Sequence, residues 1–231
     1  MPEFTVTGEI DPFLHVTLQQ GEKIYAESDA MVTMDATLEL TGKMRGGFFS
    51  SIARSFTAGE SFFQQSIEAN RGGGDVLLAP GTPGGVQLLE IGAQHYLLND
   101  GAFLAADDKV SLTVRSQGIG NAIFGGTGGL FVLETGGIGK IAVCGFGSLF
   151  ELDIDTNVGM IVDNHHVVAW DSSLQYEIST ATNDTGFFSG MINSVKSGEG
   201  FVTKFRGKGK VVICSRNKPG FASFLGGLMG K

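Results

Sequence analysis

The sequence has few charged residues, few prolines and almost no cysteine. Only 17% of its 231 residues are charged, against ~25% in an average soluble protein, and it contains 5 Pro, 2 Cys and 1 Trp. Two Cys residues cannot form a disulfide framework, which excludes a small disulfide-stapled scaffold. The low charge fraction predicts that partner subunits cover part of the surface.

The sequence also lacks the pattern of a secretory leader or of a membrane-spanning helix. Its N-terminal part carries Glu3, Glu9 and Asp11 and has no basic segment followed by an apolar one, which argues against a signal peptide. The longest uncharged stretch, residues 116–133, contains six Gly, and we interpret it as a loop followed by a strand. We expect a cytoplasmic protein and leave open its peripheral attachment to a membrane.

Positive charge is too scarce for nucleic acid to be the expected partner. The net charge is −8, and phosphate backbones are bound mainly by clusters of Lys and Arg. The short basic stretch "KFRGKGK" at 204–210 is typical of a solvated strand end. RNA binding therefore remains the least favoured alternative.

Glycine is abundant, with 36 residues, and the sequence repeats itself. The stretch "GTGGLFVLETGGIGKIAVCG" (126–145) aligns without gaps to "KSGEGFVTKFRGKGKVVICS" (196–215), and "TAGESFFQQSIEANRGGGDVLLA" (57–79) is a third version. Internal repeats of this length predict an array of similar units. The predicted units are residues 1–80, 81–148 and 149–217, followed by an apolar, Gly-rich tail at 218–231.

Each unit has the pattern of β-strands. "VSLTV" alternates apolar and polar residues, whereas "IAVC" and "VVIC" are continuous apolar runs typical of strands buried on both faces. The equivalent structural positions are Asp35, Asp107 and Asp171, where a strand must turn, and Gly139 and Gly209, which precede the buried runs. The predicted fold is all-β, with three tandem small β-sandwiches or short double-stranded β-helices related by a pseudo-threefold within the chain.

Three such units in a row leave two strand edges open, and open edges pair with other chains. A closed ring of identical copies removes both edges. We therefore expect a homo-oligomer.

Several of these segments resemble the altered-inheritance-of-mitochondria (mitochondrial biogenesis) family. The resemblance lies in "SGEGFVTKFRGKGKVV", "AGESFF", "LLNDGAFLAADDKVSL" and "APGTPG", and it covers roughly residues 3–215. The units of that family are similar to the tryptophan RNA-binding attenuator protein. The resemblance implies ring-shaped homotrimers with nine units, and its mitochondrial members are linked to inner-membrane organisation. It implies no defined biochemical activity.

The middle unit departs from this pattern. Glu60 and Glu199 follow Gly in the flanking units, but the middle unit has Gly128-Gly129-Leu130 and no equivalent carboxylate. The RNA-binding function of the attenuator does not carry over, because the chain is acidic and lacks a basic base-reading cluster.

No residue pattern predicts catalysis, a cofactor or a metal site. The four His residues are His15, His95, His165 and His166, and their spacing does not match a metal-binding motif. Cys144 and Cys214 end the apolar runs and are expected to be small buried side chains. We predict that the protein is not an enzyme and binds no cofactor.

The most distinctive feature is a set of apolar side chains in loops and in the tail. "GFFSSIARSF" (47–56) and "GFFSGMINSV" (186–195) occupy equivalent loops, with apolar residues four apart as on one face of a helical turn. The candidate interaction surface consists of Phe48, Phe49, Ile52, Phe56, Phe187, Phe188, Met191, Val195, Phe221, Phe224 and Leu225.

Two interpretations of this set remain open. These side chains either close the ends of the sandwiches and pack between subunits, or they form a docking face for a partner protein or a membrane surface. Our hypothesis is a non-enzymatic, ring-forming scaffold or interaction module that uses this docking face. The alternative is a small-ligand binder or an enzyme with a site at a unit or subunit junction, using Glu60, Glu199 or the His165–His166 pair.

Overall fold

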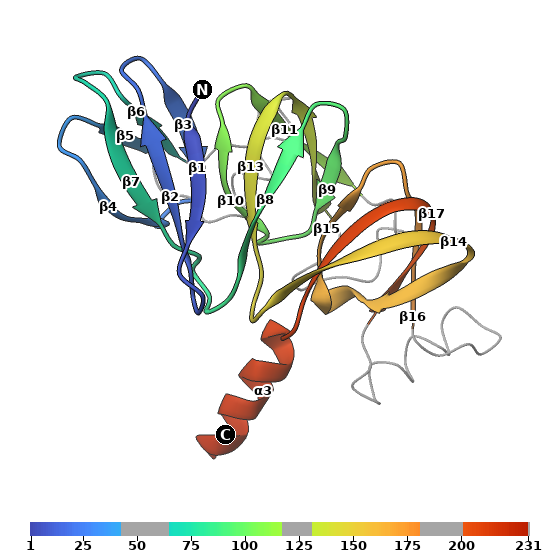
Figure 1. Cartoon of the computed structure of the whole chain (residues 1–231). Coiled ribbons are helices and arrows are strands. Elements are labelled where there is room, and N and C mark those ends of the chain that lie inside the picture. Colours follow the sequence, from blue (N-terminus) through green and yellow to red (C-terminus); the bar gives the residue numbers. More distant parts are fainter. Residues whose placement is uncertain (43–64, 117–130, 181–200, 231) are drawn as a thin grey trace.

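The structure is a computed structural model that describes residues 1–42, 65–116, 131–180 and 201–230. It consists mostly of antiparallel strands, which form three sheets arranged along the chain, and one C-terminal helix (Figure 1). The predicted predominance of β structure is confirmed, whereas the division into three equivalent units stays a prediction.

The first sheet has four strands and is built entirely from the first third of the chain. In spatial order they are β1 (Glu3–Thr7), β2 (Phe13–Leu18), β7 (Gly74–Leu78) and β4 (Met31–Met34). Alternation along β2 places Leu14, Val16 and Leu18 in the core, each with no exposed surface. The polar residues between them face solvent on the other side of the sheet.

The second sheet has six strands and joins the first third of the chain to the second. In spatial order they are β5 (Glu39–Gly42), β6 (Gln65–Glu68), β3 (Lys23–Ala26), β10 (Phe103–Asp107), β13 (Gly139–Cys144) and β8 (Val86–Ile91). The run from Ile141 to Cys144 is buried, as its continuous apolar sequence predicts.

The third sheet contains the remaining strands. Its main path runs through β11 (Val110–Ser116), β12 (Phe131–Gly137), β9 (Tyr96–Leu98), β15 (Val167–Asp171), β17 (Phe201–Cys214) and β14 (Leu149–Asp163), and β16 (Gln175–Thr180) pairs with β17. A short 3-10 helix, η1 (Asn164–His166), connects β14 to β15.

The buried apolar side chains form three clusters: one between the first and second sheets, one between the second and third, and one within the third sheet. Trp170 centres the cluster nearest the C-terminus, where its ring meets Tyr176 and Phe205 edge-on with centroids 5.2 and 5.8 Å away. Edge-to-face pairs of this kind stabilise a core by about 0.5–1.5 kcal/mol beyond simple burial.

The C-terminal tail corrects the all-β prediction, because it forms helix α3 (Lys218–Leu228). Asn217 caps the first turn, where its side-chain oxygen accepts a hydrogen bond from the N–H of Gly220 (2.6 Å), and Pro219 follows in that turn. Gly230, with φ +68°, ends the helix in the left-handed conformation. The Gly residues inside the tail weaken the helix but do not prevent it.

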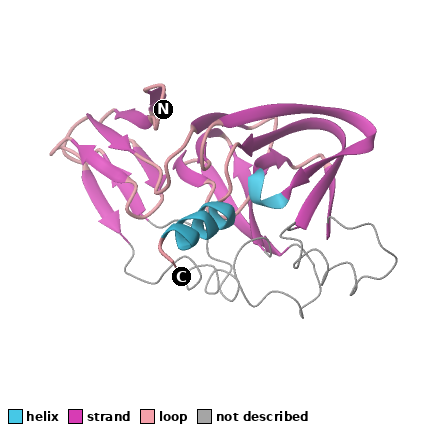
Figure 2. Cartoon of the chain, turned by 90° about the horizontal axis from the view of Figure 1, so that it is seen from below, coloured by secondary structure: helices cyan, strands magenta, loops and turns pink. Residues whose placement is uncertain are grey.

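Helix α3 points away from the sheets at the bottom of Figure 1, and Figure 2 shows it from below. Among the described residues, no helix is long and apolar enough to cross a membrane. The uncharged stretch at 116–133 lies mostly outside the described residues.

Candidate interaction surface

Helix α3 carries a stripe of large apolar side chains that the sheets leave uncovered. The stripe consists of Phe221, Phe224, Leu225 and Leu228, with exposed fractions of 40%, 60%, 40% and 69%. Their i, i+3, i+4, i+7 spacing places them on one face of the helix. No residue of α3 is buried, so the stripe is available for contact with another apolar surface.

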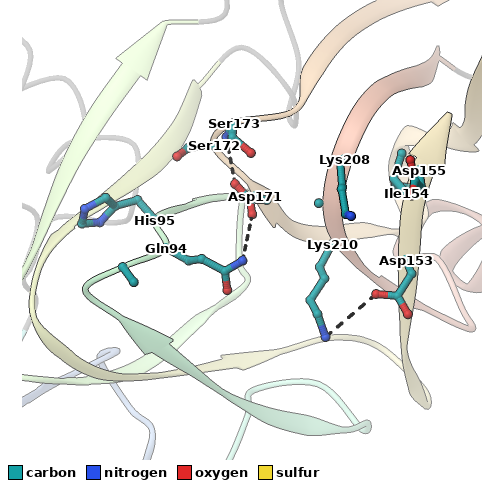
Figure 3. A pocket seen from close by; sticks show the side chains of 12 residues that line it. Gln94, His95, Asp153, Ile154, Asp155, Asp171, Ser172, Ser173, Lys208 and Lys210 are labelled. Atoms are coloured by element: carbon teal, nitrogen blue, oxygen red, sulfur yellow. Dashed lines mark hydrogen bonds and ion pairs between the residues drawn. The ribbon is translucent and has the colours of Figure 1, made fainter. Parts of the chain in front are cut away.

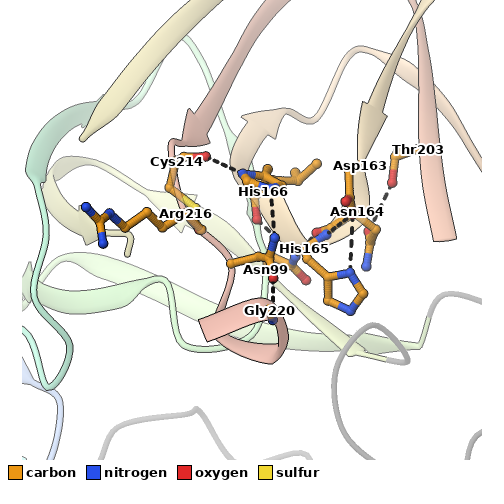
Figure 4. Close-up of polar contacts among 11 residues, drawn as sticks. Asn99, Asp163, Asn164, His165, His166, Thr203, Cys214, Arg216 and Gly220 are labelled. Carbon is orange, nitrogen blue, oxygen red and sulfur yellow. Dashed lines mark hydrogen bonds and ion pairs between the residues drawn. The ribbon is translucent and has the colours of Figure 1, made fainter. Parts of the chain in front are cut away.

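The base of the helix is fixed through His166 of η1, which is itself hydrogen-bonded to β17 of the third sheet (Figure 4). The Nδ1 atom of His166 donates to the carbonyl oxygen of Cys214 (2.7 Å), since a carbonyl can only accept. The Nε2 atom of His166 is then free to accept from the side-chain amide of Asn217 (3.1 Å). Asn217 therefore caps the helix and ties it to the body at the same time.

An aromatic contact fixes the first turn of α3. The ring of buried Phe146 meets Phe221 edge-on, with centroids 5.1 Å apart at 63°. Phe221 in turn stacks on Phe224, with centroids 6.5 Å apart. The apolar stripe thus begins at the body and continues outward along the helix.

Glu27 and Lys218 lie near each other beside the first turn of α3. Burial raises the pKa of Glu27 to about 7, and the nearby positive charge of Lys218 opposes that rise. Lys218 lies against Gly101, where an added Cβ atom would be 3.0 Å from its Nζ atom. After Glu199 the sequence contains seven Lys or Arg residues and no Asp or Glu, so the end of the chain is basic.

The other candidate surface residues lie outside the described residues. These are Phe48, Phe49, Ile52 and Phe56 in segment 43–64, and Phe187, Phe188, Met191 and Val195 in segment 181–200. Glu60 and Glu199 fall in the same segments. The structure therefore locates only the helical part of the candidate interaction surface, which includes Phe221, Phe224 and Leu225.

The repeated Asp positions lie at turns, and Gly139 and Gly209 lie in strands β13 and β17 beside two of them. Asp107 and Asp171 each accept, through Oδ1, a hydrogen bond from the backbone N–H two residues later (3.1 and 2.9 Å). Gly139 and Gly209 lie against these two Asp side chains, where an added Cβ atom would be 2.8 and 3.0 Å from the Asp Cβ. Asp35 Oδ2 instead accepts from a backbone N–H across the β4–β7 pair, at 2.9 Å. These bonds engage the three carboxylates in local structure.

A polar groove of about 560 Å³ lies between the turn before β9, the turn after β15, and strands β14 and β17 (Figure 3). Most of its charged groups already have partners: Lys210 pairs with Glu151 and lies 4.0 Å from Asp153, and Gln94 donates to Asp171 at 3.4 Å. His95 also lines the groove, and its Nδ1 atom is buried without a hydrogen-bond partner.

Within the described part of the chain, no group of three or more His, Cys, Asp or Glu residues could hold a metal ion. His15 contacts Asp75 through Nε2 (2.8 Å), and His165 contacts Asp163 through Nδ1 (3.2 Å). Hydrogen bonds from Thr17 and from His15 lower the pKa of Asp75. These His residues therefore make single local contacts.

Both cysteines are free and buried, in agreement with the sequence analysis. Burial raises the pKa of Cys144 to about 12, so its thiolate is scarce at neutral pH.

The sequence model of one family, described as mitochondrial biogenesis AIM24, matches residues 4–216. The chain belongs to this family. An uncharacterised protein of Streptococcus pyogenes serotype M6 is 38% identical over 229 residues, which is 96% of this chain and 89% of that protein. The crystal structure of a Streptococcus pyogenes protein, 36% identical, superposes with a TM-score of 0.80 over 97% of this chain and 98% of that one.

Family membership thus confirms the resemblance seen in the sequence, and the names of these relatives state no activity. The base of α3 was not predicted from the sequence. The Asn217–Pro219 pair and Gly230 are typical helix start and stop residues and could have indicated the helix. Nothing in the sequence marks Phe146 or His166 as the groups that fix it.

Proposed function

We propose that this protein is a non-enzymatic scaffold whose C-terminal helix docks on a membrane surface. In this proposal the chain consists of three tandem units similar to the tryptophan RNA-binding attenuator protein. Copies of the chain close into a ring of three, the number that the family resemblance implies. The ring presents one copy of α3 from each chain.

The exposed apolar stripe of α3 is the observation that carries the docking proposal. Its residues Phe224, Leu225 and Leu228 are 40–69% exposed, so covering each of them contributes roughly half of the about 1.5–3 kcal/mol that complete burial of such a side chain supplies. An isolated helix of 11 residues is marginal in water, so the helix gains stability when a second surface covers the stripe.

The charge and length of α3 favour a membrane over a protein groove. Arg216 and Lys218 lie at its base, and residues 216–231 contain no Asp or Glu, a charge balance that complements anionic lipid headgroups. Eleven residues span about 16 Å, roughly half of the ~30 Å hydrocarbon core, so the helix can enter one leaflet. The Phe-rich segments around Phe48 and Phe187 would add apolar contacts to the same docking.

Vesicle flotation tests the proposal. The full chain should float with vesicles of phosphatidylcholine and phosphatidylserine, and less well with phosphatidylcholine alone. The double variant Phe224→Ser/Leu228→Ser should lose flotation. Ile138→Ser is the matched control, because Ile138 is 60% exposed, as Phe224 is, and lies in the β12–β13 turn instead of beside the strand that leads into α3.

Flotation of the Phe224→Ser/Leu228→Ser variant at the wild-type level would contradict docking through α3. The variant Phe48→Ser/Phe49→Ser/Phe187→Ser/Phe188→Ser measures what the Phe-rich segments contribute. If the wild type does not bind vesicles but binds a protein through the same stripe, a protein partner replaces the membrane in the proposal.

A second candidate function, the binding of a small polar ligand, rests on the groove lined by His95. Its support is the groove itself, which charged and polar side chains from four segments line. A thermal-shift screen of metabolites tests it, since a ligand at 100 times its Kd stabilises the folded state by ~2.7 kcal/mol. A genuine hit should lose its shift in His95→Phe, and a hit unaffected by that change binds elsewhere.

A further inference from the structure

Two pairs of strands join successive parts of the chain in the same way. One joint is β3 with β10, and the other is β9 with β15; both are antiparallel. The first pairs Ala26 with Ala105, Tyr25 with Ala106 and Ile24 with Asp107. The second pairs Leu98 with Ala169, Leu97 with Trp170 and Tyr96 with Asp171. In each joint the pairing ends on the Asp that forms the turn.

We call β3 and β9 the incoming strands of the two joints and β10 and β15 the receiving strands. Each receiving strand contains a β-bulge. It leaves one extra residue, Leu104 in β10 and Val168 in β15, relative to the strand on the other side. The carbonyl oxygens of these two residues accept hydrogen bonds from the N–H groups of Glu27 and Asn99, both at 2.8 Å. The bulge and this hydrogen bond together define the register of each joint.

Strand β4 has the same features as the receiving strands but lacks an incoming strand. Its pairing with β7 shifts between Met31 and Thr33, so Val32 is the bulged residue, and the strand is followed by Asp35. In the part of the chain that the structure describes, β4 pairs with β7 alone. Val32 is 53% exposed at this open edge.

The last part of β14 has the features of an incoming strand without a receiver. Val162 precedes β15 by five residues, as Ala26 precedes β4 and Leu98 precedes β10. One edge of this segment pairs with β17, where Val162 lies opposite Thr203, and no described strand pairs with its other edge. Ile161 is 63% exposed there.

We propose that β14 of one copy pairs with β4 of the next copy, in the register of the two internal joints. That register places Val162 opposite Thr33, Ile161 opposite Met34 and Met160 opposite Asp35. The N–H of Asp163 donates to the carbonyl oxygen of Val32, as Glu27 and Asn99 donate within the chain. This inference rests on the ring-forming part of the proposed function and is independent of docking through α3.

Burial at the internal joint shows what this pairing achieves. Leu97 and Trp170 face each other across β9 and β15, and both are only 2% exposed. Ile161 and Met34 are the corresponding pair between copies, and the contact removes the exposed Ile161 side chain from water. It also covers two strand edges that would otherwise pair indiscriminately. The contact is head-to-tail, the geometry that generates a closed ring when the rotation permits.

Light scattering on purified protein tests the contact with two matched variants. Ile161→Asp should convert the oligomer to a monomer at micromolar concentration, because it places a carboxylate against Met34. Ile138→Asp should leave the oligomer intact, since Ile138 is 60% exposed but lies in the β12–β13 turn. Equal oligomers for wild type and Ile161→Asp would overturn the proposed joint.

A disulfide tests the register. Residues opposite each other as a hydrogen-bonded pair have Cα atoms about 5.5 Å apart, within the ~4.4–6.8 Å of disulfides. Ile161→Cys/Met34→Cys should therefore cross-link copies under mild oxidation, whereas Asp163→Cys/Met34→Cys, displaced by two residues or about 7 Å, should not. The native Cys144 and Cys214 are buried and should stay reduced.

The possible outcomes separate the proposals. A monomeric wild type removes both the ring and this joint. An oligomer that cross-links equally in both cysteine pairs, or in neither, retains the ring and overturns this register. Neither result changes what vesicle flotation says about α3, because flotation depends on the Phe224–Leu228 stripe.

Discussion

Gly139 lies directly against the side chain of Asp107, so closely that a Cβ atom at Gly139 would be 2.8 Å from the Cβ atom of Asp107. Gly139 also has φ +136°, which L-residues with a side chain rarely adopt. Two independent constraints therefore select glycine here, at the start of β13 and beside the turn that ends β10.

Gly139→Ala should lower the free energy of unfolding by about 1–3 kcal/mol, because the added methyl group strains the backbone and displaces Asp107. Urea denaturation monitored by Trp170 fluorescence measures this effect. Gly81→Ala is the control, since no atom lies within 4 Å of a Cβ at that position. Equal midpoints for the two variants would contradict the close contact.

Asn217→Ala should destabilise α3 by about 1 kcal/mol, because the helix loses its N-cap and its bond to His166. Hydrogen exchange of the amides in 218–228 should become faster, while exchange in β13 stays unchanged. Asn217→Asp separates the two roles. It keeps an oxygen for the cap but has no amide to donate to His166, so exchange near the wild-type rate would assign the stability to the cap.

Glu27 should make the folded state less stable as pH rises. Burial raises its pKa to about 7, so between ~4.3 and 7 the unfolded chain loses this proton before the folded one does. Its stabilising contribution is full below pH 4 and declines as pH rises through 7. The free energy of unfolding of Glu27→Gln should match that of the wild type at pH 4 and exceed it by about 1–2 kcal/mol at pH 8. This range is smaller than the pKa shift alone implies, because Glu27 is partly exposed and solvent screens its charge.

Urea midpoints at pH 4, 6 and 8 measure this difference. Glu68→Gln provides a control of opposite sign, because the hydrogen bond from Lys23 lowers the pKa of Glu68. That variant should be slightly less stable than the wild type at pH 8. A Glu27→Gln variant that follows the wild type at every pH would show that Glu27 is not held in a buried environment.

Cys144 should resist alkylation as long as the protein is folded. Its side chain is 5% exposed and its pKa is raised to about 12, so at pH 8 little thiolate is present and reagent cannot reach it. Iodoacetamide should label Cys144 only across the urea transition, as followed by peptide mass spectrometry. Complete labelling within minutes in native buffer would contradict this burial.

Local features of the fold could be predicted from the sequence because they depend on near neighbours. The run "IAVC" forms the buried end of β13, and turns follow β10 and β15 at Asp107 and Asp171. Alternation and turn residues act over a few positions, so one sequence contains their signal. The family resemblance depends on longer segments, and the family model that matches residues 4–216 confirms it.

Helix α3 was not predicted, because the tail is rich in Gly, which disfavours a helix, and the capping residues Asn217 and Gly230 were not recognised. The pairing of β3 with β10 could not be predicted either, since it joins residues about 80 positions apart through backbone groups that every residue has. The same holds for the contact of Phe146 with Phe221, which depends on where two distant segments meet.

The order of strands in the three sheets also bears on how the chain is made. The first sheet contains no residue beyond Leu78, the second none beyond Cys144, and the third none beyond Cys214. On the ribosome each sheet therefore has all its strands before synthesis of the next is finished, and nascent chains fold from the N-terminus onward. Translation itself can supply the order of assembly, and helix α3 emerges after all three sheets, when every described surface that anchors it already exists.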